Sequence, residues 1–220
     1  MSSIKLKHAS GNSMSIAAPA TNPASDLSLK LPATVGTAGQ VLKNSSTPGT
    51  LEFGGLGGGI TQVDQWQQTT DFDSSDQTLT SNWARSDATA SGSYQNFGRI
   101  GTGMSESSGI FTFPSTGIWR VEFMATARHV NYQRRFLTGR ILITKDNSTY
   151  RDAVWPYTSI YTESPETYAT SLGITLVDVT STTNCKVKFG VTSDGSMTWM
   201  ADSSYGTPYT FAIFTRLGDT

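Results

Sequence analysis

The stretch Gly109-Ile-Phe-Thr-Phe-Pro-Ser-Thr-Gly117-Ile-Trp-Arg-Val-Glu-Phe123 decides the fold class. Its centre, from Pro114 to Gly117, predicts a turn, because proline fixes its own φ at a value that turns use and glycine readily adopts the positive φ that many turns require. After the turn, Val121 and Phe123 alternate with charged residues, and successive side chains of a β-strand lie on opposite faces of the sheet. We therefore expect two strands joined by a tight turn, the second with one buried face.

Short strands of the same kind are predicted along most of the chain beyond residue 60. Turn signals at residues 114–117, 145–148, 178–184 and 193–195 separate them. The predicted strands cover residues 60–69, 77–85, 109–113, 117–128, 134–145, 168–178, 185–192 and 208–217. Short strands with regular turns, and no predicted helix, favour a β-sandwich or jelly roll for a head that spans residues 61–220.

The composition agrees with an all-β protein. Charged residues make up 15% of the chain and aromatic residues 10%, which is too little charge for a helical bundle or a disordered chain and enough aromatic surface for a core. The formal net charge of −1 gives no electrostatic footprint for nucleic acid or an anionic membrane. The single Cys185 excludes an intrachain disulfide framework.

The N-terminus, Met1-Ser-Ser-Ile-Lys-Leu-Lys-His8, lacks the apolar region of a secretory signal peptide. No apolar run reaches the ~20 residues that a membrane-spanning helix needs. We expect a protein made in a reducing cytoplasm without a signal peptide, with neither nucleic acid nor membrane insertion among its interactions.

Residues 1–60 differ from the head in composition. They hold six charged residues, and their apolar residues come in short alternating groups such as Leu27-Ser-Leu-Lys-Leu31. The glycine-rich stretch 54–59 supplies almost no side chains and predicts a hinge. So few apolar residues cannot fill a private core, and isolated two-stranded pieces are marginally stable in water.

We expect three copies of residues 1–60 to share one core in an attachment and shaft region. The residues predicted to form the trimerisation core are Leu27, Leu29, Leu31, Val41, Leu42, Leu51 and Phe53. The alternative is a disordered tail that ends in a glycine linker.

One motif in this region resembles a module of bacteriophage fibre proteins. Leu31-Pro-Ala-Thr-Val-Gly-Thr-Ala-Gly-Gln-Val-Leu-Lys43, a turn, and Thr50-Leu-Glu-Phe-Gly54 are similar to the fibre pattern "LP…G…GQVL……G.L.(F/W)", which precedes a distal domain. The residues alone predict a strand, a turn and a returning strand that places Leu51 and Phe53 on one face. The resemblance implies a trimeric phage virion protein, in which residues 1–60 dock to other virion proteins.

The stretch from Gly109 to Phe123 resembles the signature "G.FT.P..G.Y.F.F" of complement-type globular heads, which belong to the tumour-necrosis-factor-like jelly rolls. Trp119 stands where the signature has tyrosine. Later elements at residues 172–176, 185–191 and 211–217 follow in the family's order. The resemblance implies that the head is a jelly roll and that three heads pack about a threefold axis in a compact homotrimer.

An acidic group in the head does not match a metal site. Asp71-Phe-Asp-Ser-Ser-Asp76 would need glycine at the sixth position and an acid at the twelfth to be a calcium loop of the helix–loop–helix type, but these positions hold Asp76 and Asn82. We expect a solvated turn there instead. Asp194-Gly195-Ser196 is likewise expected to be a turn.

No residue pattern predicts catalysis. His129 has no second His or Cys at metal-ligand spacing, so we expect it at a surface or an interface. Nucleophile-elbow, zinc-protease and phosphate-loop motifs are missing from the sequence. We therefore expect a protein that is no enzyme and holds no cofactor or metal. Carboxylates that converge from distant strands to cleave a glycan stay an open alternative.

The segment Tyr150-Arg-Asp-Ala-Val-Trp-Pro-Tyr-Thr-Ser-Ile-Tyr-Thr-Glu-Ser-Pro-Glu-Thr-Tyr168 alternates little, which predicts a long loop. Long loops on a rigid scaffold are frequent binding sites, and aromatic rings offer wide contact areas to sugars and proteins. We predict that Trp155, Tyr157 and Tyr161 bind a host receptor. Trp199, Tyr205 and Tyr209 form a second candidate near the final loop. The alternative for each ring is packing beneath the loop, around the last strand or in the trimer interface.

Together these observations predict a structural virion protein, a homotrimeric tail-fibre-type appendage whose head contacts a host-surface glycan or protein. One alternative is a capsid decoration protein or head fibre that stabilises the shell. A second is a cellular lectin-like or cytokine-like jelly-roll module, against which the absence of a signal peptide and the fibre-type motif count. A third, a glycan-depolymerising tailspike, would need a longer chain and an acidic cleft.

Overall fold

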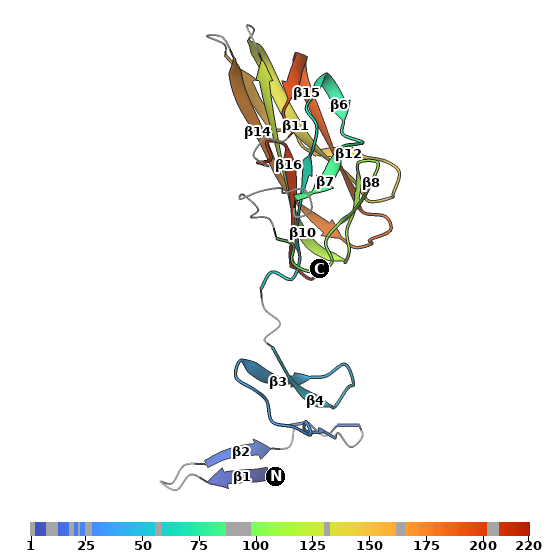
Figure 1. Cartoon of the computed structure of the whole chain (residues 1–220). Helices are drawn as coiled ribbons and strands as arrows, with labels where there is room; N and C mark the ends of the chain where they lie inside the picture. Colours follow the sequence, from blue (N-terminus) through green and yellow to red (C-terminus); the bar gives the residue numbers. More distant parts are fainter. Residues whose placement is uncertain are drawn as a thin grey trace. The chain divides into compact units, whose positions relative to one another are not determined.

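The computed structural model describes residues 3–7, 13–17, 20–21, 23–24, 28–55, 59–86, 98–129, 133–161, 166–201 and 207–220, with the backbone alone for 3–7 and 13–17. The elements of these residues are β-strands, as the all-β prediction requires (Figure 1). The chain divides into two compact units, Met1–Gly58 and Gly59–Thr220.

The first unit consists of two antiparallel hairpins. β1 (Ser3–Lys7) pairs with β2 (Ser13–Ala17), and β3 (Gln40–Asn44) pairs with β4 (Leu51–Gly55). The Phe53 ring packs so closely on Gly36 that a Cβ at residue 36 would lie 2.6 Å from it. Leu29, Leu31 and Leu42 are 64%, 73% and 47% exposed.

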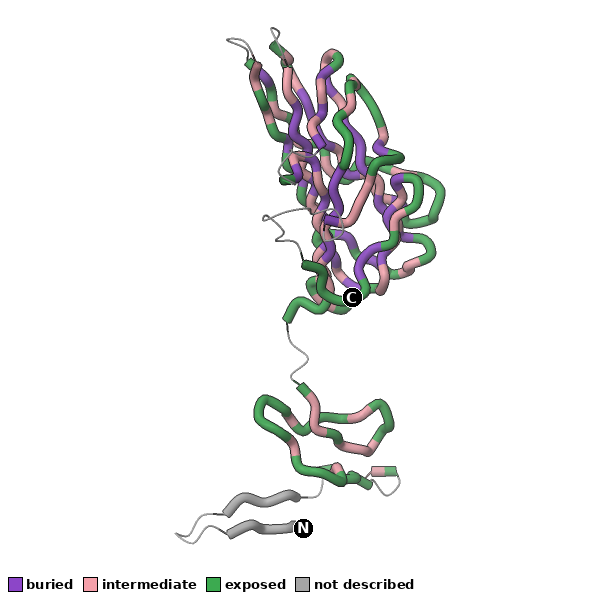
Figure 2. The backbone as a smooth tube through the Cα atoms, viewed as in Figure 1, coloured by how far each residue is buried: buried purple, intermediate pink, exposed green. Residues whose placement is uncertain are grey.

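The described residues of this unit include no fully buried side chain. Of the residues predicted for a shared core, Val41, Leu51 and Phe53 are half-buried, and Leu27 lies outside the described residues. In Figure 2 those residues of this unit whose burial is described are coloured intermediate or exposed, whereas buried residues run along the strands of the second unit. A private core is therefore missing from the described part of the first unit, as its composition predicts.

The second unit, the head, contains the remaining strands. In chain order these are β5 (Val63–Gln68), β6 (Phe72–Thr78), β7 (Trp83–Arg85), β8 (Ser105–Ser107), β9 (Ile110–Thr112), β10 (Gly117–His129), β11 (Arg134–Thr144), β12 (Arg151–Val154), β13 (Tyr157–Ile160), β14 (Thr167–Val179), β15 (Lys186–Trp199) and β16 (Phe211–Gly218).

The strand pairings arrange the head as two antiparallel layers. Sheet 1 has the order β7-β5-β16-β10-β14. Sheet 2 is built around β15, which pairs with β11, β9 and β6, while β12 and β13 both pair with the other edge of β11. The sheets meet where the end of β15 reaches β10, with Thr198 opposite Arg128. This is the topology of a jelly roll, in which strands that are distant in sequence become neighbours.

Inward-facing rings from both sheets fill the core. Phe111 lies 5.3 Å from both Phe189 and Phe214 between ring centroids, and Phe123 lies 4.7 Å from Phe189. These four rings are fully buried. The alternation read from Ile118 to Phe123 is therefore the pattern of a strand with one face in this core.

A buried carboxylate ties the start of the head together. Asp64, which is fully buried, accepts hydrogen bonds from Trp66 Nε1 (2.9 Å), Arg85 Nε (2.9 Å) and the Met104 amide (2.7 Å). Gly103 permits this approach, because a Cβ there would lie 2.6 Å from the Asp64 carboxylate and its φ is +74°. A charge buried this deeply needs such partners.

The structure corrects four local predictions. The strand predicted over residues 77–85 is interrupted, because residues 79–82 separate β6 from β7. Residues 150–161 form β12 and β13 instead of a loop, because the edge of β11 offers backbone hydrogen-bonding groups that these residues satisfy. The acidic group at residues 71–76 lies largely in β6, which pairs with β15. The segment predicted as a turn at residues 194–196 lies inside β15, where the register with β6 shifts between Thr192 and Met197.

Candidate functional site

Three aromatic side chains lie together on the outer side of sheet 2. Trp155 and Tyr157 are stacked with their ring centroids 6.1 Å apart and their planes at 25°. Phe136 on β11 meets the Tyr157 ring edge-on at 5.7 Å. Trp155 is 40% exposed and Tyr157 is 65% exposed. We call Phe136, Trp155 and Tyr157 the aromatic surface.

A polar network adjoins the aromatic surface. The Arg140 guanidinium lies 5.1 Å from the Trp155 ring centroid and donates to Asp76 Oδ1 at 2.9 Å. The Thr192 hydroxyl donates to the same Asp76 oxygen at 2.9 Å. The Arg140 side chain is 13% exposed and that of Asp76 is 65% exposed. The largely buried Arg140 guanidinium therefore orients the Trp155 ring, while the exposed Asp76 carboxylate can accept hydrogen bonds from the hydroxyl groups of a ligand.

The structure places the other predicted receptor residues elsewhere. Tyr161 is 74% exposed but lies in a different cavity, of about 350 Å³, beside Arg134 and Ile160. Trp199 is fully buried and its Nε1 donates to the Ser74 carbonyl, so its predicted role at the receptor surface is wrong. The end of β15 turns this ring into the core. Tyr205 lies outside the described residues.

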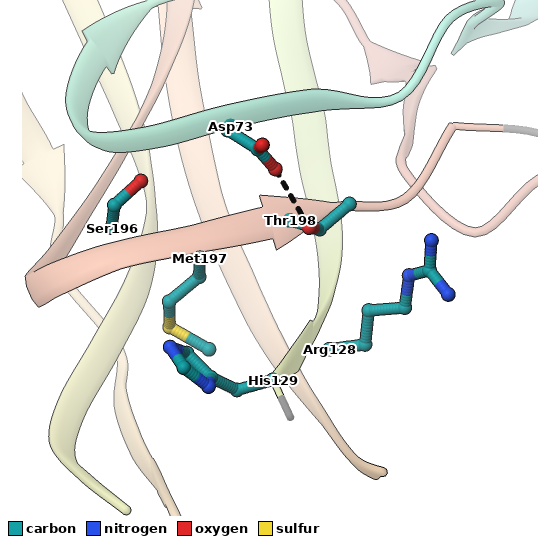
Figure 3. A pocket seen from close by; sticks show the side chains of 6 residues that line it. All are labelled: Asp73, Arg128, His129, Ser196, Met197 and Thr198. Carbon is teal, nitrogen blue, oxygen red and sulfur yellow. Dashed lines mark hydrogen bonds between the residues drawn. The ribbon is translucent and has the colours of Figure 1, made fainter. Parts of the chain in front are cut away.

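A pocket of about 320 Å³ lies at the corner where β15 passes from sheet 2 to sheet 1, and the sequence did not indicate it. Figure 3 shows its lining. The lining residues come from β6, β10 and β15 and are Asp73, Arg128, His129, Ser196, Met197 and Thr198. We call this cavity the corner pocket. It adjoins the register shift of β15, and such irregularities in strands are frequent beside binding sites.

Hydrogen bonds hold the polar side chains of the corner pocket. Thr198 Oγ1 donates to Asp73 Oδ1 at 2.6 Å, and Arg128 Nη1 donates to Glu166 Oε1 at 2.6 Å. The Tyr168 hydroxyl donates to the other Glu166 oxygen at 2.6 Å. The hydrogen bonds from Tyr168 and from Arg128 hold the pKa of Glu166 below its usual value. The hydrogen bond to Glu166 in turn raises the pKa of Arg128. The guanidinium charge is therefore committed to this carboxylate.

His129 is half-buried in the corner pocket. Its Nε2 lies 2.7 Å from Arg134 Nη2. A guanidinium can only donate, so Nε2 accepts and the ring proton resides on Nδ1. The described part of the chain contains no group of three or more His, Cys, Asp or Glu residues that could hold a metal ion. It also contains no helix that is long and apolar enough to cross a membrane.

The outer side of sheet 1 carries an unusual row of apolar residues. On β14, Leu172, Ile174 and Leu176 are 52%, 45% and 62% exposed. Across the sheet, Leu172 lies opposite Met124, which in turn lies opposite Phe211 of β16. We call the outward side chains of this region the apolar face: Met124, Leu172, Ile174, Leu176, Phe211 and Ile213.

No family model matches this chain, and no curated protein matches its sequence. Among solved structures, the chain is similar to the TNF protein Eiger from S. frugiperda, with a TM-score of 0.50 and 11% identity over 72% of this chain and 93% of that chain. It is also similar to murine APRIL at pH 8.0, with a TM-score of 0.48 and 12% identity over 71% of this chain and 98% of that chain. At such identities the likeness to Eiger shows the fold alone. The prediction of a tumour-necrosis-factor-like jelly roll is thereby confirmed.

Proposed function

We propose that the protein is a structural virion protein of a bacteriophage, a homotrimeric tail-fibre-type appendage whose jelly-roll head contacts the host surface. The observation that carries this proposal is the apolar face of sheet 1. Its three β14 residues leave about half of their side-chain surface in water in a single chain. Glu122 and Arg120 of β10 lie opposite Ile174 and Leu176, so the apolar side chains of the face surround one pair of charges. Exposed apolar residues grouped in this way mark an association site.

The occupant of the apolar face is a second copy of the head, and three copies close into a ring. A polar partner would leave the leucines unpaired, whereas a copy of the same chain supplies matching apolar area. The charges near the centre of the face are already paired, because Arg120 Nη2 donates to Glu122 Oε2 at 3.0 Å. The resemblance of the head to the tumour-necrosis-factor-like jelly rolls supports three as the number of copies.

The first unit supports the assignment to a fibre. Its exposed Leu29, Leu31 and Leu42 need partners that the described part of the unit does not supply. Trimerisation would place these residues against their copies, with assembly coupled to folding. The similarity of residues 26–54 to the phage fibre module favours attachment to other virion proteins through this region.

The aromatic surface supports an adhesive role for the head. The stacked rings suit the C–H side of a sugar ring, and the adjacent carboxylate suits the hydroxyl groups of the sugar. Each trimer would present three such surfaces. Simultaneous engagement raises the apparent affinity by about 10²–10⁴-fold without any new contact.

Light scattering on the purified full chain tests the assembly. Three chains of 23.7 kDa give a trimer of about 71 kDa, whereas a monomer at micromolar concentration would contradict the proposed apolar contact. Gold-labelled antibodies against the head, applied to intact phage particles, test the location. Label at the tail supports the fibre, label over the shell indicates a capsid decoration protein, and unlabelled particles would refute the virion assignment.

A further inference from the structure

We propose that the corner pocket is a second ligand site, which binds one uncharged, hydroxyl-rich sugar unit of monosaccharide size. The proposal stands on the pocket and is independent of the virion assignment. Small-molecule sites in proteins run from roughly 300 to 1,000 Å³. A pocket of about 320 Å³ lies at the small end of this range and suits a single sugar ring.

The pocket offers the polar groups that recognise hydroxyls. Asp73 is exposed, and within the described part of the head its carboxylate accepts a hydrogen bond from Thr198 alone, which leaves lone pairs for ligand donors. The exposed Ser196 adds a hydroxyl that both donates and accepts. The buried Nε of Arg128 has no hydrogen-bond partner among the residues that the structure describes. Paired donors and acceptors of this kind match the vicinal hydroxyl groups of a sugar.

The pocket also offers an apolar wall. Figure 3 shows Met197 and the His129 ring on one side of the cavity and Asp73 with Thr198 on another. Arg134 Nη2 lies 2.7 Å from His129 Nε2 and so holds the imidazole ring in place beside the cavity. Met197 is only 2% exposed and closes the floor of the cavity, so the half-buried His129 ring is the surface that the C–H side of a sugar can contact.

The charge around the pocket favours an uncharged ligand. The Arg128 guanidinium is offset by Glu166, which it contacts at 2.6 Å. The carboxylate of Asp73 has no cation within salt-bridge distance among the described residues. The Arg134 guanidinium, which contacts His129 and the Ser196 carbonyl, supplies a further charge beside these lining residues. Together with the Arg128–Glu166 pair and the Asp73 carboxylate it leaves no surplus positive charge for an anionic sugar or a phosphate.

The pocket lies at the end of sheet 1 opposite the point where β5 begins. β5 begins with Val63 opposite Thr215, near the point where β10 begins. The corner pocket lies at the other end of β10, beside Arg128 and His129. The chain thus enters the head at one end of sheet 1 and the pocket opens at the opposite end.

A methyl resonance within the pocket provides the test. The full chain is labelled with ¹³C-methyl methionine, and Met197→Leu identifies the Met197 signal among the six methionines. Methyl glycosides of glucose, galactose, mannose and N-acetylglucosamine are titrated separately at millimolar concentrations, with glucuronic acid as the anionic comparison. We expect at least one neutral glycoside to shift the Met197 signal saturably, while Met124 on sheet 1 stays unchanged.

Variants separate this site from the aromatic surface. Asp73→Asn removes the charged acceptor and should weaken the binding seen at Met197 about tenfold. Ser196→Ala, a change at an exposed position, should weaken it by a smaller factor. Trp155→Ala should leave the Met197 titration unchanged, and thermal melting checks that each variant is folded.

Three results would overturn the proposal. These are a Met197 signal that none of the glycosides shifts, folded Asp73→Asn and Ser196→Ala proteins that both titrate like the wild type, or tighter binding of glucuronic acid than of the neutral sugars. Loss of the proposed virion function would appear instead in the trimer mass and the particle labelling, which this titration does not measure.

Discussion

Replacing Leu172 by alanine should weaken the trimer while leaving the fold of each head intact. Leu172 lies on β14 opposite Met124 and is 52% exposed in the single chain. Full burial of a leucine side chain contributes about 1.5–3 kcal/mol, so covering the remaining half contributes about 1 kcal/mol per protomer. A trimer contains three copies, and the loss is therefore about 3 kcal/mol per trimer, or roughly a hundredfold in the dissociation constant.

Sedimentation equilibrium over a range of concentrations measures this constant. Leu142→Ala is the matched control, because Leu142 is a half-buried residue of β11 that lies opposite Lys188 in sheet 2. We expect the control to dissociate like the wild type. If Leu172→Ala and Leu142→Ala have equal dissociation constants, the apolar face is not the contact between copies. A lower melting temperature of dissociated Leu172→Ala heads would show that the residue supports the fold itself.

Five further variants test other parts of the molecule. Asp64→Asn removes the buried charge that Arg85 neutralises and should lower the free energy of unfolding by about 3 kcal/mol in chemical denaturation; an unchanged midpoint would contradict the role assigned to this pair. Gly109→Ala places a Cβ 2.1 Å from a backbone carbonyl at a φ of +75° and should cost at least about 1 kcal/mol, whereas Gly218→Ala, with no atom within 4 Å, should change stability by less than about 0.5 kcal/mol. Hydrogen bonds from the Thr144 hydroxyl and from two backbone amides hold the pKa of Asp146 far below its usual value. The stability that the ionised Asp146 contributes is therefore present above about pH 4 and declines as the pH falls further. The difference in melting temperature between the wild type and Asp146→Asn should shrink over that acid range. Trp155→Ala should weaken the free energy of adsorption of the head to host cells by about 1–3 kcal/mol and leave the melting temperature unchanged. If both the adsorption and the melting temperature fall, the ring supports the fold instead.

The fold class was predictable because it depends on local patterns. The period-two alternation after Gly117 and the turn residues before it are properties of neighbouring positions, and they specify a strand whichever partner it finds. The glycines and the sparse leucines of residues 1–60 likewise show, by composition, that this region lacks a private core. The jelly-roll order of the head was predicted from its resemblance to a known signature.

The site required the tertiary structure. β12 and β13 show little alternation and form because the edge of β11 is open to pairing. Trp155 and Trp199 look alike as sequence, but one lies at a sheet edge and the other is turned into the core by the end of β15. The corner pocket joins Asp73 to Arg128 and Thr198. Residues so far apart in the chain meet through strand register, which long-range packing sets and which no local pattern encodes.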